Sequence, residues 1–168
     1  MSGHLKISEI FSDLDVKHGV SLFCDSELDH IEDLITEHQG TYIIKCQIKD
    51  RDKVAKPEEI VRQLFIRRLM VEYGFPKDRI DIERVVYFGS RDYGLSDIAI
   101  LHTDLETPLI IFEIKRPKRK DGLEQLKSYC NAEGAPIGVW SNGNEMIRSK
   151  SSTNLIFYSM KLHLLKLQ

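Results

Sequence analysis

The apolar run Leu-Ile-Ile-Phe at residues 109–112 constrains the fold more than any other part of the sequence. A strand with one face in water alternates apolar and polar residues, whereas an unbroken apolar run is typical of a central strand covered on both faces. We expect this strand to span residues 109–115, because Pro117 cannot donate a ladder hydrogen bond and closes it. The run therefore predicts a sheet with helices on both sides.

The segments around this strand alternate between helical and extended patterns. Pro57 suits the first turn of a helix whose apolar residues recur at helical spacing until Gly74. The expected order is helix, three strands, helix, strand, which indicates an α/β fold with a central mixed sheet flanked by helices. After the first helix, the expected elements are strands 80–88, 94–101 and 109–115, helix 122–133 and strand 136–140.

The two ends of the chain are harder to interpret. We expect residues 1–50 to form an N-terminal appendage, 51–148 the core, and 149–168 a C-terminal apolar extension. Within the appendage, the spacing predicts a helix over residues 27–38 and a strand over 41–48. The extension contains apolar segments at 155–158 and 162–167 with no clear pattern, and could be a surface for docking a missing partner.

Composition excludes several classes of protein. No apolar run approaches the roughly 18 residues of a membrane span, and the first ten residues lack the apolar segment of a signal peptide, so we expect a cytoplasmic protein without membrane contact. The three cysteines are scattered without zinc-site spacing. A net charge of −2 argues against binding nucleic acid by bulk electrostatics, so tight DNA binding would need partners.

Glu113 and Lys115 lie at the end of the apolar strand 109–115, and a third charged residue, Asp97, lies on the strand predicted before it. Glu113 and Lys115 are two residues apart and point to the same side of their strand, and pairing with the preceding strand would bring Asp97 beside Glu113. Carboxylates are hard oxygen ligands suited to Mg²⁺, which could activate water, while a lysine orients that water or offsets charge. The alternative is a strand-end salt bridge, which the predicted order of elements makes less favourable.

Further polar residues could belong to the same site. Gln125 and Tyr129 share one helix face, where they could contact the site or a phosphate, although Tyr129 could equally be core and Gln125 surface. Residues 115–120 read KRPKRK and include Lys118 and Arg119, which could contact phosphates or form a solvated loop. The remaining candidates for an additional metal-binding acid are Glu59, which could equally be a helix-dipole partner, and Glu83.

Four stretches of the sequence resemble the N-terminal nuclease domain of type I restriction enzyme R subunits. They are KPEEIVRQ at 56–63, SDIAI at 96–100, FEIKRPK at 112–118 and GLEQLKSYCNAEGAPIGVWSNG at 122–143. The resemblance covers roughly residues 40–148 and implies a restriction-endonuclease-like PD-(D/E)xK fold. Ser96-Asp97 replaces the proline-aspartate of the family name, and Glu113 and Lys115 match its ExK element. Gln125 and Tyr129 match the QxxxY element of the RecB-like branch, and Glu59 lies where many relatives carry a helix acid.

The resemblance implies a Mg²⁺-dependent DNA endonuclease, with Mn²⁺ as a possible substitute, whose catalytic residues are Asp97, Glu113 and Lys115. Asp97, Glu113 and Glu59 would bind the metal; Gln125, Tyr129, Lys118 and Arg119 would position DNA. The expected partners are the motor, methylase or specificity subunits of a restriction-modification system. No GxxxxGK[ST] motif occurs, so we expect no ATP site in this chain. The alternatives are a catalytically silent module that binds DNA or protein, and a subunit that docks onto a larger complex.

Overall fold

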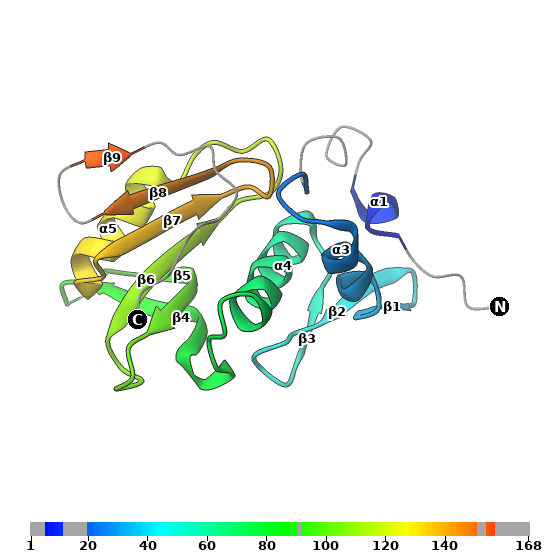
Figure 1. The fold of residues 1–168 in the computed structure, drawn as a ribbon, viewed down its shortest axis with the longest axis horizontal. Coiled ribbons are helices and arrows are strands. Elements are labelled where there is room, and N and C mark those ends of the chain that lie inside the picture. The colour runs from blue at the N-terminus through cyan, green and yellow to red at the C-terminus, as the bar shows by residue number, and fades with distance from the viewer. Residues whose placement is uncertain (1–5, 12–19, 91, 151–153, 157–168) are drawn as a thin grey trace.

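The computed structural model describes residues 6–11, 20–90, 92–150 and 154–156 (Figure 1). Four α-helices and one 3-10 helix occur in these residues: α1 (Ile7–Ile10), α3 (Asp25–Glu32), α4 (Pro57–Val71), η1 (Lys77–Arg79) and α5 (Leu123–Glu133). The strands of a smaller sheet are β1 (Ile35–His38), β2 (Thr41–Lys45) and β3 (Asp52–Val54). The strands of a larger sheet are β4 (Ile80–Phe88), β5 (Asp92–Leu101), β6 (Pro108–Ile114), β7 (Ile137–Ser141), β8 (Met146–Lys150) and β9 (Asn154–Ile156).

The larger sheet is mixed. Its order is β4-β5-β6-β7-β8-β9, and every neighbouring pair is antiparallel except β6 and β7, which are parallel. A parallel pair needs a crossover, and α5 supplies it between these two strands. The apolar strand β6 has neighbours on both sides and is buried along most of its length. The expected central mixed sheet, flanked by helices, is therefore confirmed.

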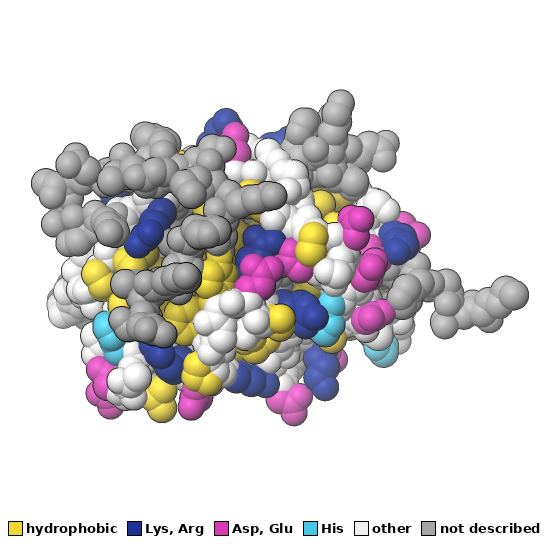
Figure 2. Space-filling view, in the orientation of Figure 1, with side chains coloured by type: hydrophobic (Ala, Val, Ile, Leu, Met, Phe, Trp, Pro, Cys, Tyr) yellow, Lys and Arg dark blue, Asp and Glu magenta, His cyan; other side chains and the backbone are white. Residues whose placement is uncertain are grey.

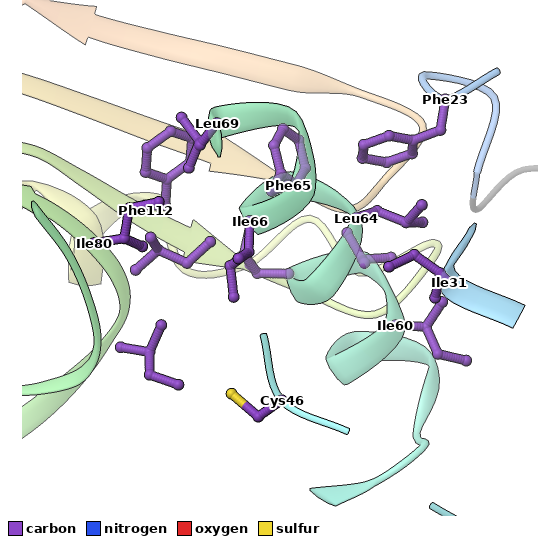
Figure 3. Packing of buried hydrophobic residues seen from close by; sticks show 14 of the residues in the cluster. Phe23, Ile31, Cys46, Ile60, Leu64, Phe65, Ile66, Leu69, Ile80 and Phe112 are labelled. Atoms are coloured by element: carbon purple, nitrogen blue, oxygen red, sulfur yellow. The ribbon is translucent and has the colours of Figure 1, made fainter. Parts of the chain in front are cut away.

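Helices α4 and α5 cover opposite faces of this sheet (Figure 1). Successive residues of β6 show the division, because Ile110 and Phe112 belong to the apolar cluster around α4, whereas Ile111 belongs to the cluster around α5. Phe65 of α4 lies at the centre of the first cluster, with its ring centroid 5.9 Å from that of Phe112 and 5.1 Å from that of Phe23 (Figure 3). The continuous apolar sequence of β6 follows from this covering on both faces.

The smaller sheet lies on the other side of α4 and corrects one prediction (Figure 1). The helix expected over residues 27–38 ends at Glu32, and its predicted last part is strand β1, so this prediction is wrong beyond Glu32. Gln39 and Gly40 both have positive φ and join β1 to β2 in a two-residue hairpin turn. Pairing with β2 therefore outweighed the helical spacing of the isolated segment.

The main apolar cluster extends across the boundary we expected at residue 50. Ile31 and Ile44 are fully buried in the same cluster as Leu64 of α4 and Ile98 of β5. At the other end, residues 149–150 and 154–156 belong to strands β8 and β9 of the larger sheet. The apolar segment expected at 162–167, and the last two residues of the one at 155–158, lie outside the described residues. The domain bounds stay a prediction.

None of the described helices has both the length and the apolar character needed to cross a membrane.

A buried ion pair joins α3 to α4. Arg68 donates to Glu27 from Nε at 2.8 Å and from Nη2 at 2.5 Å, and Glu27 also accepts from the Cys24 amide at 2.9 Å. Burial alone would raise the pKa of Glu27, but the hydrogen bonds from Arg68 and Cys24 outweigh it and lower that pKa. The carboxylate therefore stabilises the fold above its ordinary pKa of 4.5, and this contribution is lost as the pH falls further.

We expect Glu27→Gln to lower the free energy of unfolding at pH 7 by about 3 kcal/mol, because it leaves the buried Arg68 without its ion-pair partner. Urea denaturation at pH 7 and at pH 3 measures this effect. The difference between the wild type and the variant should be smaller at the lower pH, because below pH 4.5 the unfolded wild type takes up a proton that the folded protein binds less tightly. A difference that is equal at both pH values would contradict this account.

Candidate active site

Asp97 and Glu113 lie at the point where strands β5 and β6 separate. The last pair of their ladder at this end is Ile98 with Phe112, so Asp97 and Glu113 are the next residue on each strand. Instead of continuing the ladder, the Ile114 amide donates to Asp97 Oδ2 at 2.7 Å. Both carboxylates are buried, Asp97 at 9% and Glu113 at 1% exposure. The fold therefore brings two acidic side chains together inside the protein.

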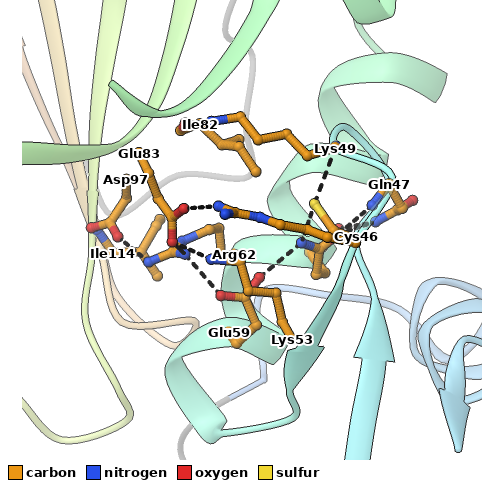
Figure 4. A network of polar contacts seen from close by, with 12 residues as sticks. Cys46, Gln47, Lys49, Lys53, Glu59, Arg62, Ile82, Glu83, Asp97 and Ile114 are labelled. Carbon is orange, nitrogen blue, oxygen red and sulfur yellow. Dashed lines mark hydrogen bonds and ion pairs between the residues drawn. The ribbon is translucent and has the colours of Figure 1, made fainter. Parts of the chain in front are cut away.

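Arg62 of α4 neutralises Asp97 from the helix side (Figure 4). Its Nη2 donates to Asp97 Oδ1, and its Nη1 donates to Glu59 at 2.8 Å and to Glu83 at 3.5 Å. Arg62 is itself buried, with 8% exposure. One guanidinium thus contacts carboxylates from α4, β4 and β5, and this contact ties the helix to both strands.

Lys115 has the same role for Glu113. Its Nζ donates to Glu113 Oε1, and the aliphatic part of its side chain lies against Gly122, just before α5. A Cβ at Gly122 would lie 2.5 Å from Lys115 Cε and 3.3 Å from Glu113 Cγ. A side chain at residue 122 would therefore require Lys115 to move from its position beside Glu113.

The electrostatics of the site leave Glu113 with an unusual pKa. The pKa of Glu113 is raised to about 7, chiefly by burial and by the nearby Asp97 charge, with a smaller contribution from Glu58. The hydrogen bond and the charge of Lys115 oppose this rise. Burial alone would lower the pKa of Lys115, but Glu113 outweighs this effect and raises it. A buried carboxylate beside a second carboxylate is stabilised either by taking up a proton or by binding a further cation.

Glu83 has a strained backbone inside strand β4. Its φ of 54° lies in the left-handed region, which costs a residue with a side chain about 1–3 kcal/mol. Residues four apart in a regular strand point to the same face. Here Ile82 packs in the cluster around α4 and Val86 in the cluster around α5, so the side chains change faces across Glu83. Glu83 itself accepts from Arg51, Lys53 and Arg62. These ion pairs hold the strained residue in place.

Gln125 and Tyr129 of α5 are hydrogen-bonded to each other, since Gln125 Nε2 donates to Tyr129 Oη at 2.6 Å. Gln125 is exposed, whereas Tyr129 is 4% exposed and its ring stacks on Phe88 at a centroid distance of 5.6 Å. A Cβ at Gly94 of β5 would lie 2.5 Å from Tyr129 Oη. Tyr129 thus lies on the sheet side of α5 and Gln125 at the surface beside it, and their role in positioning DNA stays a prediction.

The basic loop after β6 is exposed and partly neutralised. Arg119 pairs with Asp121 at 2.5 Å, and Lys120 pairs with Glu145 at 3.3 Å. Lys118 is exposed and has a positive φ of 69°. Figure 2 shows basic and acidic side chains interleaved on the visible face rather than one basic patch. This mixture agrees with the small net charge.

The structure brings Asp97, Glu113 and Lys115 together but directs Glu59 elsewhere. Glu59 accepts from Arg62 at 2.8 Å and from Gln63 at 2.8 Å. Within the described part of the chain, no group of three or more His, Cys, Asp or Glu side chains is arranged to hold a metal ion. The roles of the three carboxylates as metal ligands therefore stay predictions.

Three residues of the site were missed by the sequence analysis: Arg62, Gly122 and Glu58. An arginine among the apolar residues Val61 and Leu64 was a usable signal, since a buried cation needs acidic partners. Gly122 gave no such signal, because its closeness to Glu113 and Lys115 arises only when the chain folds and brings the start of α5 beside the end of β6.

Comparison with known families gives a match over most of the chain. A family model described as type I restriction enzyme R protein N terminus matches residues 57–160. This range begins at the first residue of α4, includes strands β4 to β9, and leaves out the smaller sheet. No curated protein and no solved structure matches the chain.

We expect Gly122→Ala to destabilise the protein more than the same change at Gly134. Both glycines have positive φ, which costs alanine roughly 1–2 kcal/mol, but a Cβ at Gly134 has open space. At residue 122 the methyl group also displaces Lys115 from Glu113, and the total loss should reach about 3 kcal/mol. Urea denaturation of the two variants measures the difference, and equal losses would mean that the Glu113–Lys115 pair adapts without cost.

We expect Glu113→Gln to raise the free energy of unfolding by about 2 kcal/mol at pH 8 with a chelator present. The folded protein binds the Glu113 proton more tightly than the unfolded chain, so ionisation above pH 4.5 costs stability, and the full cost is reached above about pH 7. Glu145→Gln, in the exposed pair with Lys120, is the matched control and should change little. Destabilisation by Glu113→Gln would contradict the raised pKa.

Proposed function

Because the chain belongs to the family of type I restriction enzyme R protein N termini, we propose that it is a metal-dependent DNA endonuclease domain. It would hydrolyse phosphodiester bonds as part of a restriction-modification system. The observation that carries the proposal is the meeting of Asp97, Glu113 and Lys115 where β5 and β6 separate. All three residues lie inside the matched range, and all three were selected from the sequence for this chemistry.

The order of elements supports a PD-(D/E)xK fold. From α4 onward the chain forms a helix, three antiparallel strands, a helix and a parallel strand, with the acidic residues on the second and third strands. In this fold the aspartate and the glutamate-x-lysine element stand on neighbouring strands, as Asp97, Glu113 and Lys115 do. The assignment of the fold is part of the proposal.

The residues present fit a divalent cation. Glu113 Oε2 is buried and has no hydrogen-bond partner among the described residues, so it retains full capacity to bind a ligand. Carboxylate oxygens are the ligands that Mg²⁺ prefers, and Mn²⁺ accepts the same set. Asp97 and Glu113 would hold the ion, with Glu59 as a further candidate acid. When bound, such an ion polarises the phosphodiester and lowers the pKa of water.

The side chains of the chain itself would divide the remaining work. Asp97 and Glu113 present their oxygens from the two separating strands, and the Ile114 amide holds Asp97 from the strand side. Lys115 carries a positive charge close to Glu113, where it would orient the attacking water and offset negative charge growing on the phosphate oxygens. Burial strengthens this charge–charge interaction relative to water.

Contacts with DNA would come from two elements beside the site. Lys118 and Arg119 lie on the exposed loop directly after Lys115, where they would contact phosphates. The hydrogen-bonded pair of Gln125 and Tyr129 would position the strand from α5. Cations already paired with acids bind phosphate less strongly, so sequence choice and tight binding would come from motor, methylase or specificity subunits.

Nicking of supercoiled plasmid in Mg²⁺ or Mn²⁺ tests the proposal. We expect Asp97→Ala and Lys115→Ala each to reduce the nicking rate at least about 100-fold, because each removes a group that acts in the transition state. Asp78→Ala and Lys77→Ala replace exposed residues of the same types and should retain wild-type activity. Each variant is first checked for native far-ultraviolet circular dichroism.

Three outcomes separate the candidate functions. Loss of nicking in the two site variants, with activity retained in the two control variants, supports the endonuclease proposal. Cleavage that survives Asp97→Ala or Lys115→Ala rules out the assigned site. Binding of Mn²⁺ by a wild-type protein that never cuts would favour the alternative, a catalytically silent module that binds DNA or protein.

A further inference from the structure

We propose that Arg62 is the positioning residue that holds the Asp97 carboxylate in its metal-binding orientation. Nothing in the sequence analysis assigned it a role, yet it is the side chain that contacts Asp97 from α4. This inference rests on the proposed function, because it concerns how the same site is kept ready for a cation.

Asp97 is held from two sides. Its Oδ2 accepts the Ile114 amide at 2.7 Å, and its Oδ1 accepts Arg62 Nη2. The first contact comes from a neighbouring strand and the second from a helix packed on the sheet, so the plane of the carboxylate is fixed. Each oxygen can still accept a further contact, because a carboxylate has about four acceptor sites.

Arg62 is fixed in turn by its own partners (Figure 4). Its Nη1 donates to Glu59 at 2.8 Å, and Gln63 donates to the other oxygen of Glu59 at 2.8 Å. Gln63 is held in turn by Gln47, in the loop after β2, whose backbone amide donates to Gln63 Oε1 at 3.1 Å. The guanidinium is therefore part of a connected set of hydrogen bonds rather than an isolated ion pair.

A second chain of contacts reaches Arg62 from the smaller sheet. Lys53 of β3 and Arg51 in the preceding loop both pair with Glu83, which lies 3.5 Å from Arg62 Nη1. Lys53, Glu83, Arg62 and Asp97 thus alternate in charge, and Arg51 and Glu59 join this chain as branches at Glu83 and Arg62. Through Glu83, a part of the chain outside the family match supports the orientation of Arg62.

Lysine could not replace Arg62 in this arrangement. The planar guanidinium directs separate nitrogens at Asp97 and Glu59, whereas an ammonium group is a single point charge with a different reach. Arg62→Lys therefore keeps the charge but loses one of the two contacts. Groups that orient metal ligands typically change metal affinity 10- to 100-fold when they are substituted.

The experiment is titration of the chain with Mn²⁺, followed by electron paramagnetic resonance of the free ion. We expect Arg62→Lys to weaken Mn²⁺ binding about tenfold or more. Arg68→Lys is the matched control, because Arg68 lies on the same helix, is equally buried and pairs with Glu27 in α3 rather than with the site. It should lower thermal stability and leave Mn²⁺ affinity within about twofold of wild type.

The outcomes distinguish the two proposals. Weakened binding in Arg62→Lys alone supports the positioning role, and unchanged affinity overturns it while the endonuclease proposal stands. If the Asp97→Asn variant binds Mn²⁺ as tightly as the wild type does, both proposals are overturned. Where Arg62→Lys does not fold, Arg62→Gln replaces it, since glutamine also offers a donor to Asp97. Failure of both to fold, while Arg68→Lys folds, assigns Arg62 to folding alone and overturns the proposal.

Discussion

The cost of burying carboxylates beside an apolar core governs this structure. An ionised acid removed from water must find a cation or hydrogen-bond donors, or take up a proton. Asp97 is matched by Arg62 and the Ile114 amide, and Glu113 by Lys115, with its pKa raised to about 7. Arg62 comes from α4 and Asp97 from β5, so α4 cannot move away from β5 without exposing unpaired charge.

The same requirement explains the position of the smaller sheet. Lys53 and Arg51 pair with Glu83, and Lys49 donates to the carbonyl of Ile82, so the β2–β3 region contacts β4 at its strained residue. Apolar packing continues this contact, since Ile44 is buried in the cluster that surrounds α4. The N-terminal segment therefore contributes to the surroundings of the site, although the family match begins only at residue 57.

Prediction from sequence succeeded where a short segment carries its own signal. Strand 80–88 has the bounds of β4, and α4 begins at Pro57 as expected, because alternation and helix-start signals are local. The helix expected over 27–38 failed because the partner of β1 is the next strand, which the spacing of apolar residues within 27–38 cannot reveal. Arg62 was missed for a similar reason, since its acidic partners Glu83 and Asp97 lie on two other elements.

The sequence by itself determined the class of fold and the central place of residues 109–112, because periodicity and residue type act within one segment, and it indicated Asp97, Glu113 and Lys115 as candidate site residues. Tertiary structure alone decided that Arg62 faces Asp97, that Gly122 leaves space for Lys115, and that Glu59 turns toward Arg62 and Gln63. These contacts depend on the register of β5 against β6 and on how α4 packs on the sheet. Charges find their partners only after the chain has folded, since burial is what makes pairing necessary.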